Sequence, residues 1–216
     1  MHRFETEEIN EWKNFLIGYR FALNEMNTKL TILNEEFEMI HNHNPIEHIK
    51  SRLKSPKSII RKMNVKGLEI TQENVEAHIR DIAGIRITCS FTKDIYDIVD
   101  ALRQQDDIHI LEVKDYIKNP KPNGYRSLHI ITEIPVFFSN HKKDMKVEIQ
   151  IRTVAMDFWA SLEHKIYYKF DKEVPEHILD EIKQSAEMIA ELDLKMESIN
   201  EEVNILRSQA EIASQR

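Results

Sequence analysis

The sequence contains few of the residues that mark turns or oxidised folds. Of its 216 residues only 4 are glycine, 6 are proline and 1 is cysteine. So few turn-forming residues argue against a loop-rich all-β fold. Cys89 lies in the alternating apolar run Ile85, Ile87, Cys89 and Phe91, which predicts a buried strand face. A lone buried thiol excludes a disulfide framework within the chain and is typical of a reducing cytoplasm, where we expect this protein.

Long hydrophobic runs are also missing. No stretch is apolar enough to cross a bilayer, and residues 1–8 lack the profile of a signal peptide, so we expect no membrane partner. The net charge of −7 is unevenly distributed. Residues 50–86 hold nine Lys or Arg against four acids, whereas residues 171–207 hold eleven acids against four bases. A basic middle in an acidic chain indicates a focused anion site rather than a general nucleic-acid surface, although a solvated basic helix face would have the same composition.

Apolar spacing predicts long helices at both ends of the chain. From Trp12 to Ile40 apolar side chains recur at steps of four and three, which predicts one helix over residues 7–40 with Thr6 as its N-cap. A similar stripe predicts a helix from near Pro175 to about residue 210. Two such stripes would leave large apolar patches on a monomer, so we expect a homo-oligomer.

A third helix is predicted in the basic segment. Asn44-Pro45-Ile46-Glu47 has the composition of a helix start, and we expect the helix to continue to about Lys66. In a helix, Lys54, Ser58 and Lys62 would lie along one side, because they are four residues apart. Two cations and a hydroxyl on one stripe suit a polyphosphate.

The centre of the chain predicts a sheet. Alternating apolar residues indicate strands that are separated by short helices and polar turns. We therefore expect an α+β or mixed α/β fold, with a mixed sheet of four or five strands flanked by the long N- and C-terminal helices. The predicted strands are residues 85–91, 108–113, 127–136 and 145–152, and the short helices are 71–79, 94–104 and a segment that Thr153 caps.

Polar side chains gather on the other face of the predicted strands. Glu148 lies in mid-strand, which is a poor place for a solvated carboxylate unless that face forms a cleft. After the turn at Asn123-Gly124, alternation places Tyr125, Ser127 and His129 on one face. A ring, a hydroxyl and an imidazole side by side indicate a surface that stacks on a base and holds phosphate. The alternative is a turn that enters an ordinary strand.

Five motifs follow one another along the chain. They are Asp81-Ile-Ala-Gly-Ile-Arg86, Lys114-Asp-Tyr-Ile-Lys-Asn-Pro-Lys-Pro-Asn-Gly-Tyr-Arg-Ser-Leu-His129, Val147-Glu-Ile-Gln-Ile-Arg-Thr153, Phe158-Trp159-Ala160 and Glu163-His164. Together they resemble the synthetase domain of the RelA/SpoT homologues. The resemblance covers about residues 44–170, and the flanking helices are similar to those of the single-domain small alarmone synthetases, in particular the RelP-type branch. It implies one synthetase domain over residues 1–216, with an N-terminal helix at 6–43, a catalytic core at 44–170 and a C-terminal helical extension at 171–216.

The resemblance implies a reaction and a set of site residues. Enzymes of this family transfer the β,γ-pyrophosphate of ATP to the 3′-hydroxyl of GDP or GTP and release AMP, which makes the alarmone (p)ppGpp. By resemblance Glu148 is the general base, Asp81 and Glu148 hold Mg²⁺, the assembly is a homotetramer, and hydrolase activity is not expected. The implied ATP contacts are Arg52, Lys54, Ser58, Lys62 and Arg86, and the implied GDP or GTP contacts are Lys114, Lys121, Tyr125, His129, Gln150 and Asp157.

Some positions depart from the family pattern, and other functions are compatible with parts of the sequence. Val65 and Lys114 stand where some relatives have arginine, and Glu112-Val-Lys-Asp115 differs from the motif linked to metal preference in long homologues. A nucleotide-binding regulatory module without catalysis is one alternative. An RNA-binding helical scaffold is another, which the scarcity of aromatic residues in 50–86 argues against. His41, His43 and His48 form a further, weakly supported metal-binding candidate.

Overall fold

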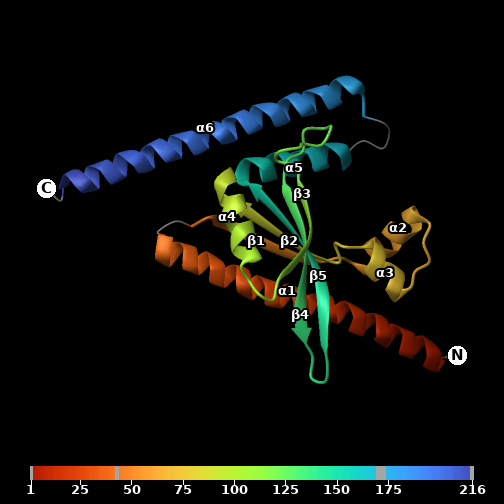
Figure 1. Cartoon of the computed structure of the whole chain (residues 1–216). Helices are drawn as coiled ribbons and strands as arrows, with labels where there is room; N and C mark the ends of the chain where they lie inside the picture. The colour runs from red at the N-terminus through yellow and green to blue at the C-terminus, as the bar shows by residue number, and fades with distance from the viewer. Residues whose placement is uncertain (1, 42–43, 169–173, 215–216) are drawn as a thin grey trace.

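A computed structural model describes residues 2–41, 44–168 and 174–214 (Figure 1). Its strands form one five-stranded sheet in the order β1-β2-β5-β4-β3. The β2–β5 pair is parallel and the other neighbouring pairs are antiparallel, so the predicted α+β fold with a mixed sheet is confirmed. The strands are β1 (Ile46–Leu53), β2 (Ala83–Cys89), β3 (His109–Asp115), β4 (Leu128–Phe137) and β5 (Lys142–Thr153); the helices are α1 (His2–His41), α2 (Pro56–Lys66), α3 (Gln72–His78), α4 (Thr92–Arg103), α5 (Val154–Tyr168) and α6 (Glu176–Ser214).

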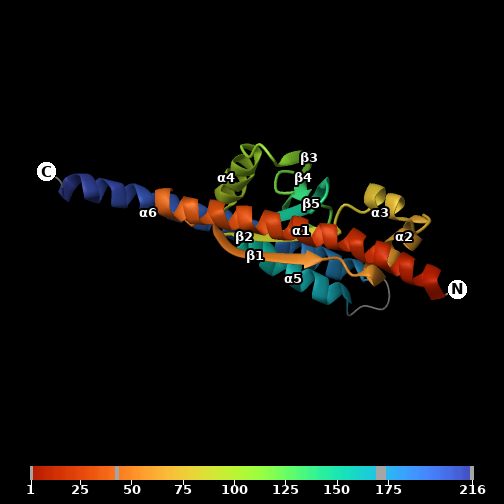
Figure 2. The same ribbon diagram turned by 90° about the horizontal axis from the view of Figure 1, so that it is seen from below.

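One face of the sheet forms the hydrophobic core. Ile87, Ile149 and Ile151 are fully buried on the two parallel central strands. Helix α1 packs across β1, β2, β5 and β4, and α4 packs against β2 and β5 on the same core. Figure 2 shows α1 running along the length of the molecule beneath the sheet. The predicted apolar stripe of α1 supplies its buried residues, which include Tyr19, Leu23, Met26, Leu30 and Leu33.

The prediction of a helix that begins at Asn44 is wrong. Residues 46–53 form the edge strand β1, and the helix α2 begins only after Ser55, whose side chain accepts from the backbone N–H of Ser58. The Asn44 side chain accepts from the Ile46 N–H, so a local turn leads into a strand rather than a helix. Lys54 therefore precedes the helix that carries Ser58 and Lys62.

Most other predicted elements are confirmed, with shifted ends. Helix α1 begins at His2, so Thr6 lies inside it and is not its N-cap. Thr71 caps α3 through the Asn74 N–H. Thr153 caps α5 as predicted, because its hydroxyl accepts from the Met156 N–H at 3.1 Å.

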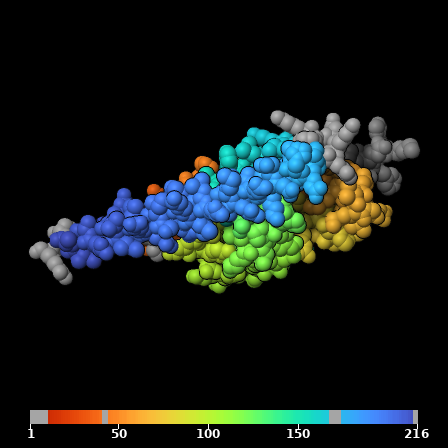
Figure 3. Space-filling view, turned by 90° about the horizontal axis from the view of Figure 1, so that it is seen from above, coloured from red at the N-terminus to blue at the C-terminus, as the bar shows by residue number. Residues whose placement is uncertain are grey.

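Helix α6 is attached to α5 and to the end of β5. The indole N–H of Trp159 donates to the Ile182 carbonyl at 3.2 Å, and the Thr153 hydroxyl donates to Asp193 at 2.5 Å. Burial raises the pKa of Asp193, although the Thr153 hydroxyl opposes this shift. Beyond these contacts α6 continues past the body of the protein (Figure 3). Within the described residues, no helix combines the length and the apolar character that a membrane crossing requires.

Candidate active site

A row of polar side chains crosses all five strands on the face opposite the core. Lys50 lies opposite Arg86, Arg86 opposite Gln150, Gln150 opposite His129, and His129 opposite Lys114. Residues in register on neighbouring strands share a face and lie within reach of one another. The register of the sheet therefore brings residues from β1 to β3 into one surface.

The next row places the catalytic candidate beside a cationic cavity. Gly84 of β2 lies between Arg52 of β1 and Glu148 of β5. Because Gly84 has no side chain, the Arg52 side chain lies over it, 3.9 Å from the position a Cβ would take. Here the surface is hollowed into a cavity of about 240 Å³, lined by Lys50, Ser51, Arg52, Gly84, Ile85, Arg86, Glu148 and Gln150.

Asp81 lies just before β2 and is bound by two lysines. Lys54 Nζ lies 2.7 Å from its Oδ2, and Lys62 Nζ lies 2.8 Å from its Oδ1. Burial alone would raise the pKa of Asp81, but the two lysines outweigh this effect and hold the pKa below its ordinary value. Asp81 is therefore a carboxylate that stays ionised in a cationic setting.

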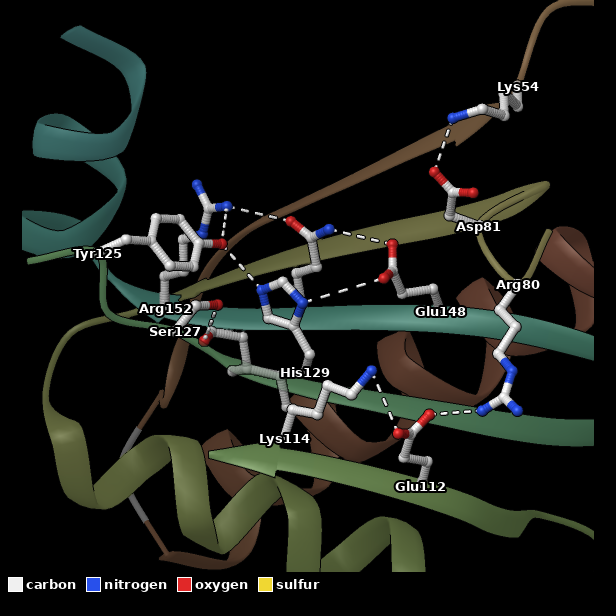
Figure 4. Close-up of polar contacts among 12 residues, drawn as sticks. Lys54, Arg80, Asp81, Glu112, Lys114, Tyr125, Ser127, His129, Glu148 and Arg152 are labelled. Carbon is white, nitrogen blue, oxygen red and sulfur yellow. Dashed lines mark hydrogen bonds and ion pairs between the residues drawn. The ribbon is translucent and has the colours of Figure 1, made fainter. Parts of the chain in front are cut away.

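Glu148 is held by its neighbours on the same face (Figure 4). The Gln150 side-chain amide donates to Glu148 Oε2 at 3.0 Å, and His129 Nδ1 lies 3.9 Å from Oε1. Figure 4 shows that Glu148 and Asp81 lie on the same side of the sheet. Two carboxylates and a set of cations thus share one surface.

An aromatic cluster lies at the other end of this surface. The Tyr125 hydroxyl is 2.8 Å from His129 Nε2, and the Tyr116 ring meets the rings of Tyr125 and His129 edge to face. Lys121 Nζ lies 4.9 Å from the centre of the Tyr125 ring and 4.8 Å from that of Tyr116. Such a cluster offers ring faces and cations to a base with attached phosphates.

The imidazole of His129 is neutral at physiological pH. Burial, followed by the nearby charges of Arg152, Lys121, Lys114 and Arg86, lowers the pKa of His129 from 6.5 to about 3. Arg152 donates to the Tyr125 hydroxyl at 2.6 Å, which leaves that hydroxyl proton free to bond to Nε2. The ring proton of His129 then lies on Nδ1, on the side of Glu148.

Asp157 connects the two ends of the surface. Its Oδ1 lies 3.2 Å from Arg152 and 3.5 Å from Arg86. Arg86 lines the cavity, whereas Arg152 contacts Tyr125. One carboxylate from the first turn of α5 therefore forms ion pairs with two guanidinium groups, one on β2 and one on β5.

Comparison with known proteins identifies the family. A model of the region found in RelA/SpoT proteins matches residues 51–173, which is more than half of the chain. The chain belongs to the RelA/SpoT family. The curated relative GTP pyrophosphokinase YwaC of Bacillus subtilis is 55% identical over 91% of this chain and 93% of its own length. GTP pyrophosphokinase YjbM of the same organism is 36% identical over 89% of this chain and 90% of its own length.

Solved structures of RelA/SpoT-family proteins have the same fold. Small alarmone synthetase 2 from Bacillus subtilis is 54% identical, with a TM-score of 0.81 over 89% of this chain and 99% of that protein. Small alarmone synthetase 1 from the same organism, bound to its product pppGpp, is 36% identical, also with a TM-score of 0.81, over 89% and 98% of the two chains. The resemblance of the sequence to the small alarmone synthetases is therefore confirmed.

The structure places the predicted RelA/SpoT site residues in three neighbouring groups. Arg52, Arg86, Glu148 and Gln150 surround one cavity, and Lys54 and Lys62 meet at Asp81. Tyr125, His129 and Lys121 form the aromatic cluster, and Asp157 lies beside it. The other two predicted contacts also have partners within the chain: Ser58 Oγ lies 2.9 Å from Ser55 Oγ, and Lys114 Nζ lies 3.2 Å from Glu112.

Two other expectations are affected by the structure. Ser127 does not share the open face with Tyr125, because it is fully buried and donates to the Ile151 carbonyl. The candidate metal cluster includes His43, which lies outside the described residues. Within the described part of the chain, no group of three or more His, Cys, Asp or Glu side chains is arranged to hold a metal ion.

Sequence reasoning missed several residues of the surface. Lys50 and Ser51 line the cavity, and Tyr116 and Arg152 belong to the aromatic cluster. A signal for Lys50 was present, because cations at 50, 52 and 54 recur with period two, the period of a strand. The same period places Arg152 on one face with Glu148 and Gln150, but its contacts to Tyr125 and Asp157 depend on side chains that meet only in the folded protein.

Gly124 and Gly67 provide a matched test of the loop before β4. Both have positive φ, +87° and +67°, so alanine strains the backbone at either position by about 1 kcal/mol. A Cβ at Gly124 would lie 2.5 Å from Ala186 Cβ, whereas nothing lies within 4 Å at Gly67. We expect Gly124→Ala to raise the KM for the guanine nucleotide and Gly67→Ala to leave it unchanged, as measured by steady-state kinetics. Equal effects of the two variants would show that the Gly124 contact does not matter.

The neutral His129 predicts a pH dependence of stability. Between the ordinary value of 6.5 and the folded value of about 3, the unfolded chain binds a proton at this imidazole that the folded protein does not. The stabilisation that the neutral His129 imidazole gives the folded protein is therefore lost as the pH falls from 6.5 toward about 3. Urea unfolding at a series of pH values should show a shallower loss for His129→Asn than for the unsubstituted protein. Parallel curves would contradict the shifted pKa.

Proposed function

We propose that this protein is a (p)ppGpp synthetase that transfers the β,γ-pyrophosphate of ATP to the 3′-hydroxyl of GDP or GTP and releases AMP. Family membership and the similarity to GTP pyrophosphokinases over nearly the whole chain support this activity. The observation that carries the proposal is the single polar face, on which Glu148 lies between a cationic cavity and an aromatic cluster. Two nucleotides bound at these places would meet at Glu148.

The cationic cavity is the proposed ATP side. Arg52 and Arg86 project from adjacent strands across the position of Gly84, and planar guanidinium groups stack well on a purine. Lys54 just before α2, with Ser58 and Lys62 within it, is proposed to hold the phosphates. A solved relative, small alarmone synthetase 1 from Bacillus subtilis, is bound to AMPCPP, and it is 33% identical with a TM-score of 0.76.

The aromatic cluster is the proposed GDP or GTP side. The Tyr125 ring is proposed to stack on guanine, with Gln150 and Asp157 forming polar contacts to the ribose and base. Lys121 lies over two ring faces and belongs, with Lys114, to the cations proposed for the acceptor phosphates. Neutral His129 has a single ring N–H to offer, so its contact to a phosphate is one hydrogen bond rather than an ion pair.

Asp81 and Glu148 are the proposed ligands of Mg²⁺. The fit is favourable because Mg²⁺ is usually held by one or two protein carboxylates together with substrate phosphates and waters. Both Asp81 oxygens are paired with lysines in this structure, so the metal would displace at least one lysine, which would then be available to the phosphates. When bound, the metal neutralises charge on the transferred group.

Glu148 is proposed as the general base toward the 3′-hydroxyl. Transfer to an alcohol requires alignment of the two nucleotides and removal of one proton. Gln150 holds one carboxylate oxygen, and the other faces His129 across 3.9 Å, so the carboxylate has a defined orientation on the open face. We propose that the reaction takes place in the cytoplasm, where both nucleotides are abundant.

The Glu148→Gln variant tests the reaction and the base together. We expect unsubstituted protein with ATP, GDP or GTP and Mg²⁺ to form AMP and (p)ppGpp, and the variant to be slower by about 10²–10⁴-fold with little change in nucleotide binding. Chromatographic separation of the products gives both rates. Glu133→Gln, on β4, removes another strand carboxylate and is the matched control. Binding of both nucleotides without AMP release by the unsubstituted protein would favour a regulatory module.

A homotetramer is proposed from the uncovered stripe on α6. Its apolar side chains recur at steps of four and three and are between 40% and 57% exposed. Figure 3 shows the outer end of α6 extending beyond the rest of the chain. A packed bundle with other copies would cover the stripe. The stripe consists of Leu192, Met196, Ile199, Val203 and Leu206.

Light scattering tests this association. We expect a mass about four times the 25.6 kDa of the chain, and a smaller mass for Ile199→Glu, which places a charge in the stripe. Ser198→Glu adds the same charge at an exposed position off the stripe and should leave the mass unchanged. A mass equal to one chain for the unsubstituted protein would contradict the proposal.

A further inference from the structure

Arg152 is almost completely buried between the catalytic and acceptor parts of the surface. Its side chain is 6% exposed and it follows Glu148 and Gln150 on the same face of β5. The guanidinium group donates to the Tyr125 hydroxyl at 2.6 Å, to Gln150 Oε1 at 3.1 Å and to Asp157 Oδ1 at 3.2 Å. Three residues proposed to contact the acceptor nucleotide therefore accept hydrogen bonds from the same guanidinium group.

Stability alone is a poor explanation for this buried charge. Removing a guanidinium group from water is costly, and the Asp157 carboxylate that balances it is shared with Arg86. The buried Nε of Arg152 also has no hydrogen-bond partner within the described part of the chain. A buried cation with an incomplete set of partners is more readily explained by what it positions.

The first group that Arg152 positions is the Tyr125 ring. The centre of its guanidinium group lies 5.1 Å from the ring centre, and one of its nitrogens holds the hydroxyl. The donors of arginine have a fixed planar arrangement, so these two contacts together restrict the orientation of the ring. A stacking surface whose orientation is fixed in advance loses less entropy when guanine binds.

The second group is the Glu148 carboxylate, which Arg152 reaches through Gln150. An amide accepts through its oxygen and donates through its nitrogen. Because Gln150 Oε1 accepts from Arg152, its Nε2 is directed to Glu148 Oε2, at 3.0 Å. In Figure 4 the dashed contacts run without a break from Tyr125 through Arg152 and the intervening amide to Glu148.

We propose that Arg152 is a positioning residue that holds the Tyr125 ring and the Glu148 carboxylate in the relative orientation that transfer requires. The inference rests on the proposed synthetase function, since it assigns the acceptor to Tyr125. Arg152 touches neither reacting atom. It acts on the acceptor half through Tyr125 and Asp157, and on the base through Gln150.

Separate measurements on the two nucleotides test this role. In Arg152→Met, we expect the KM for GDP to rise and kcat to fall, each by about tenfold or more, with the KM for ATP changed by less than about twofold. Arg152→Lys keeps the charge but not the planar set of donors, so it should resemble Arg152→Met. Thr88→Val alters the buried residue opposite Arg152 on β2 and is the control for local packing. Equal changes in the KM values for ATP and GDP, or full activity of Arg152→Lys, would overturn the proposal.

A double-mutant cycle provides a readout that a merely structural arginine would not change. Tyr125→Phe removes only the hydroxyl that accepts from Arg152. Its effect on GDP affinity should be several-fold in the unsubstituted protein and clearly smaller in Arg152→Met, where the hydroxyl has only its bond to His129 Nε2 left to lose. Independent, additive effects would overturn the proposal.

Equilibrium binding of a fluorescent GDP analogue distinguishes failure of this inference from failure of the proposed function. If the unsubstituted protein binds the analogue but forms no AMP, the synthetase assignment fails while the effect of Arg152 on binding is still measured. If it forms AMP and Arg152→Met binds the analogue normally, the positioning role is wrong. Thermal unfolding identifies any variant that is not folded. If Arg152→Met is not folded, the GDP affinity of Tyr125→Phe, which removes one oxygen, tests the same contact instead.

Discussion

The parallel pairing of β2 with β5 is the constraint on which the site depends. It places Gly84 beside Glu148 and Arg86 beside Gln150, and the antiparallel partners extend these rows to β1 and β3. A slip of one residue would exchange the two faces of β5. Ile149 and Ile151 are fully buried, and exposing each would cost about 1.5–3 kcal/mol. The core therefore fixes the register, and the register in turn fixes which polar residues meet.

The cations of the site are only partly neutralised within it. Asp81 lies between Lys54 and Lys62, and Asp157 lies between Arg86 and Arg152, so each carboxylate is shared by two cations. The positive charge that is left over suits a polyphosphate. The proposed phosphates and metal would compete for the same charged groups, so binding would exchange one set of partners for another. Groups oriented in this way before binding require little rearrangement when charge develops during transfer.

The sequence predicted the fold because the central strands alternate, and its motifs named many of the side chains that the structure places on the polar face. It failed at residues 44–53, where the start Asn44-Pro45 resembles a helix N-terminus and β1 is an edge strand. Few of the side chains of β1 are buried, and its partner strand lies more than thirty residues later, so no local apolar pattern marked it. Ser127 was misplaced for a related reason, because strict alternation does not hold in the residues before β4 begins. Contacts such as those of Arg152 and Asp81 depend on tertiary structure and have no local signal.

Helix α6 supports the proposed acceptor site and also carries the proposed interface. The Tyr125 ring packs against the small cluster formed by Trp159, Ala160, Ile182 and Ala186, in which the last two come from α6. Gly124 approaches Ala186 so closely that a Cβ has no room there. The uncovered apolar stripe lies between about 9 and 30 Å beyond Ala186 on the same helix, at 1.5 Å per residue.

Helix α6 is one continuous element of 39 residues. It carries both the support of the Tyr125 ring, which is proposed to stack on guanine, and the stripe proposed for association. Thr153 strengthens this link, since it caps α5 and also donates to Asp193 of α6. If other copies hold the outer half of α6 in place, they also steady the surface on which Tyr125 rests. Assembly and acceptor binding are then coupled through packing alone, without a partner residue entering the site.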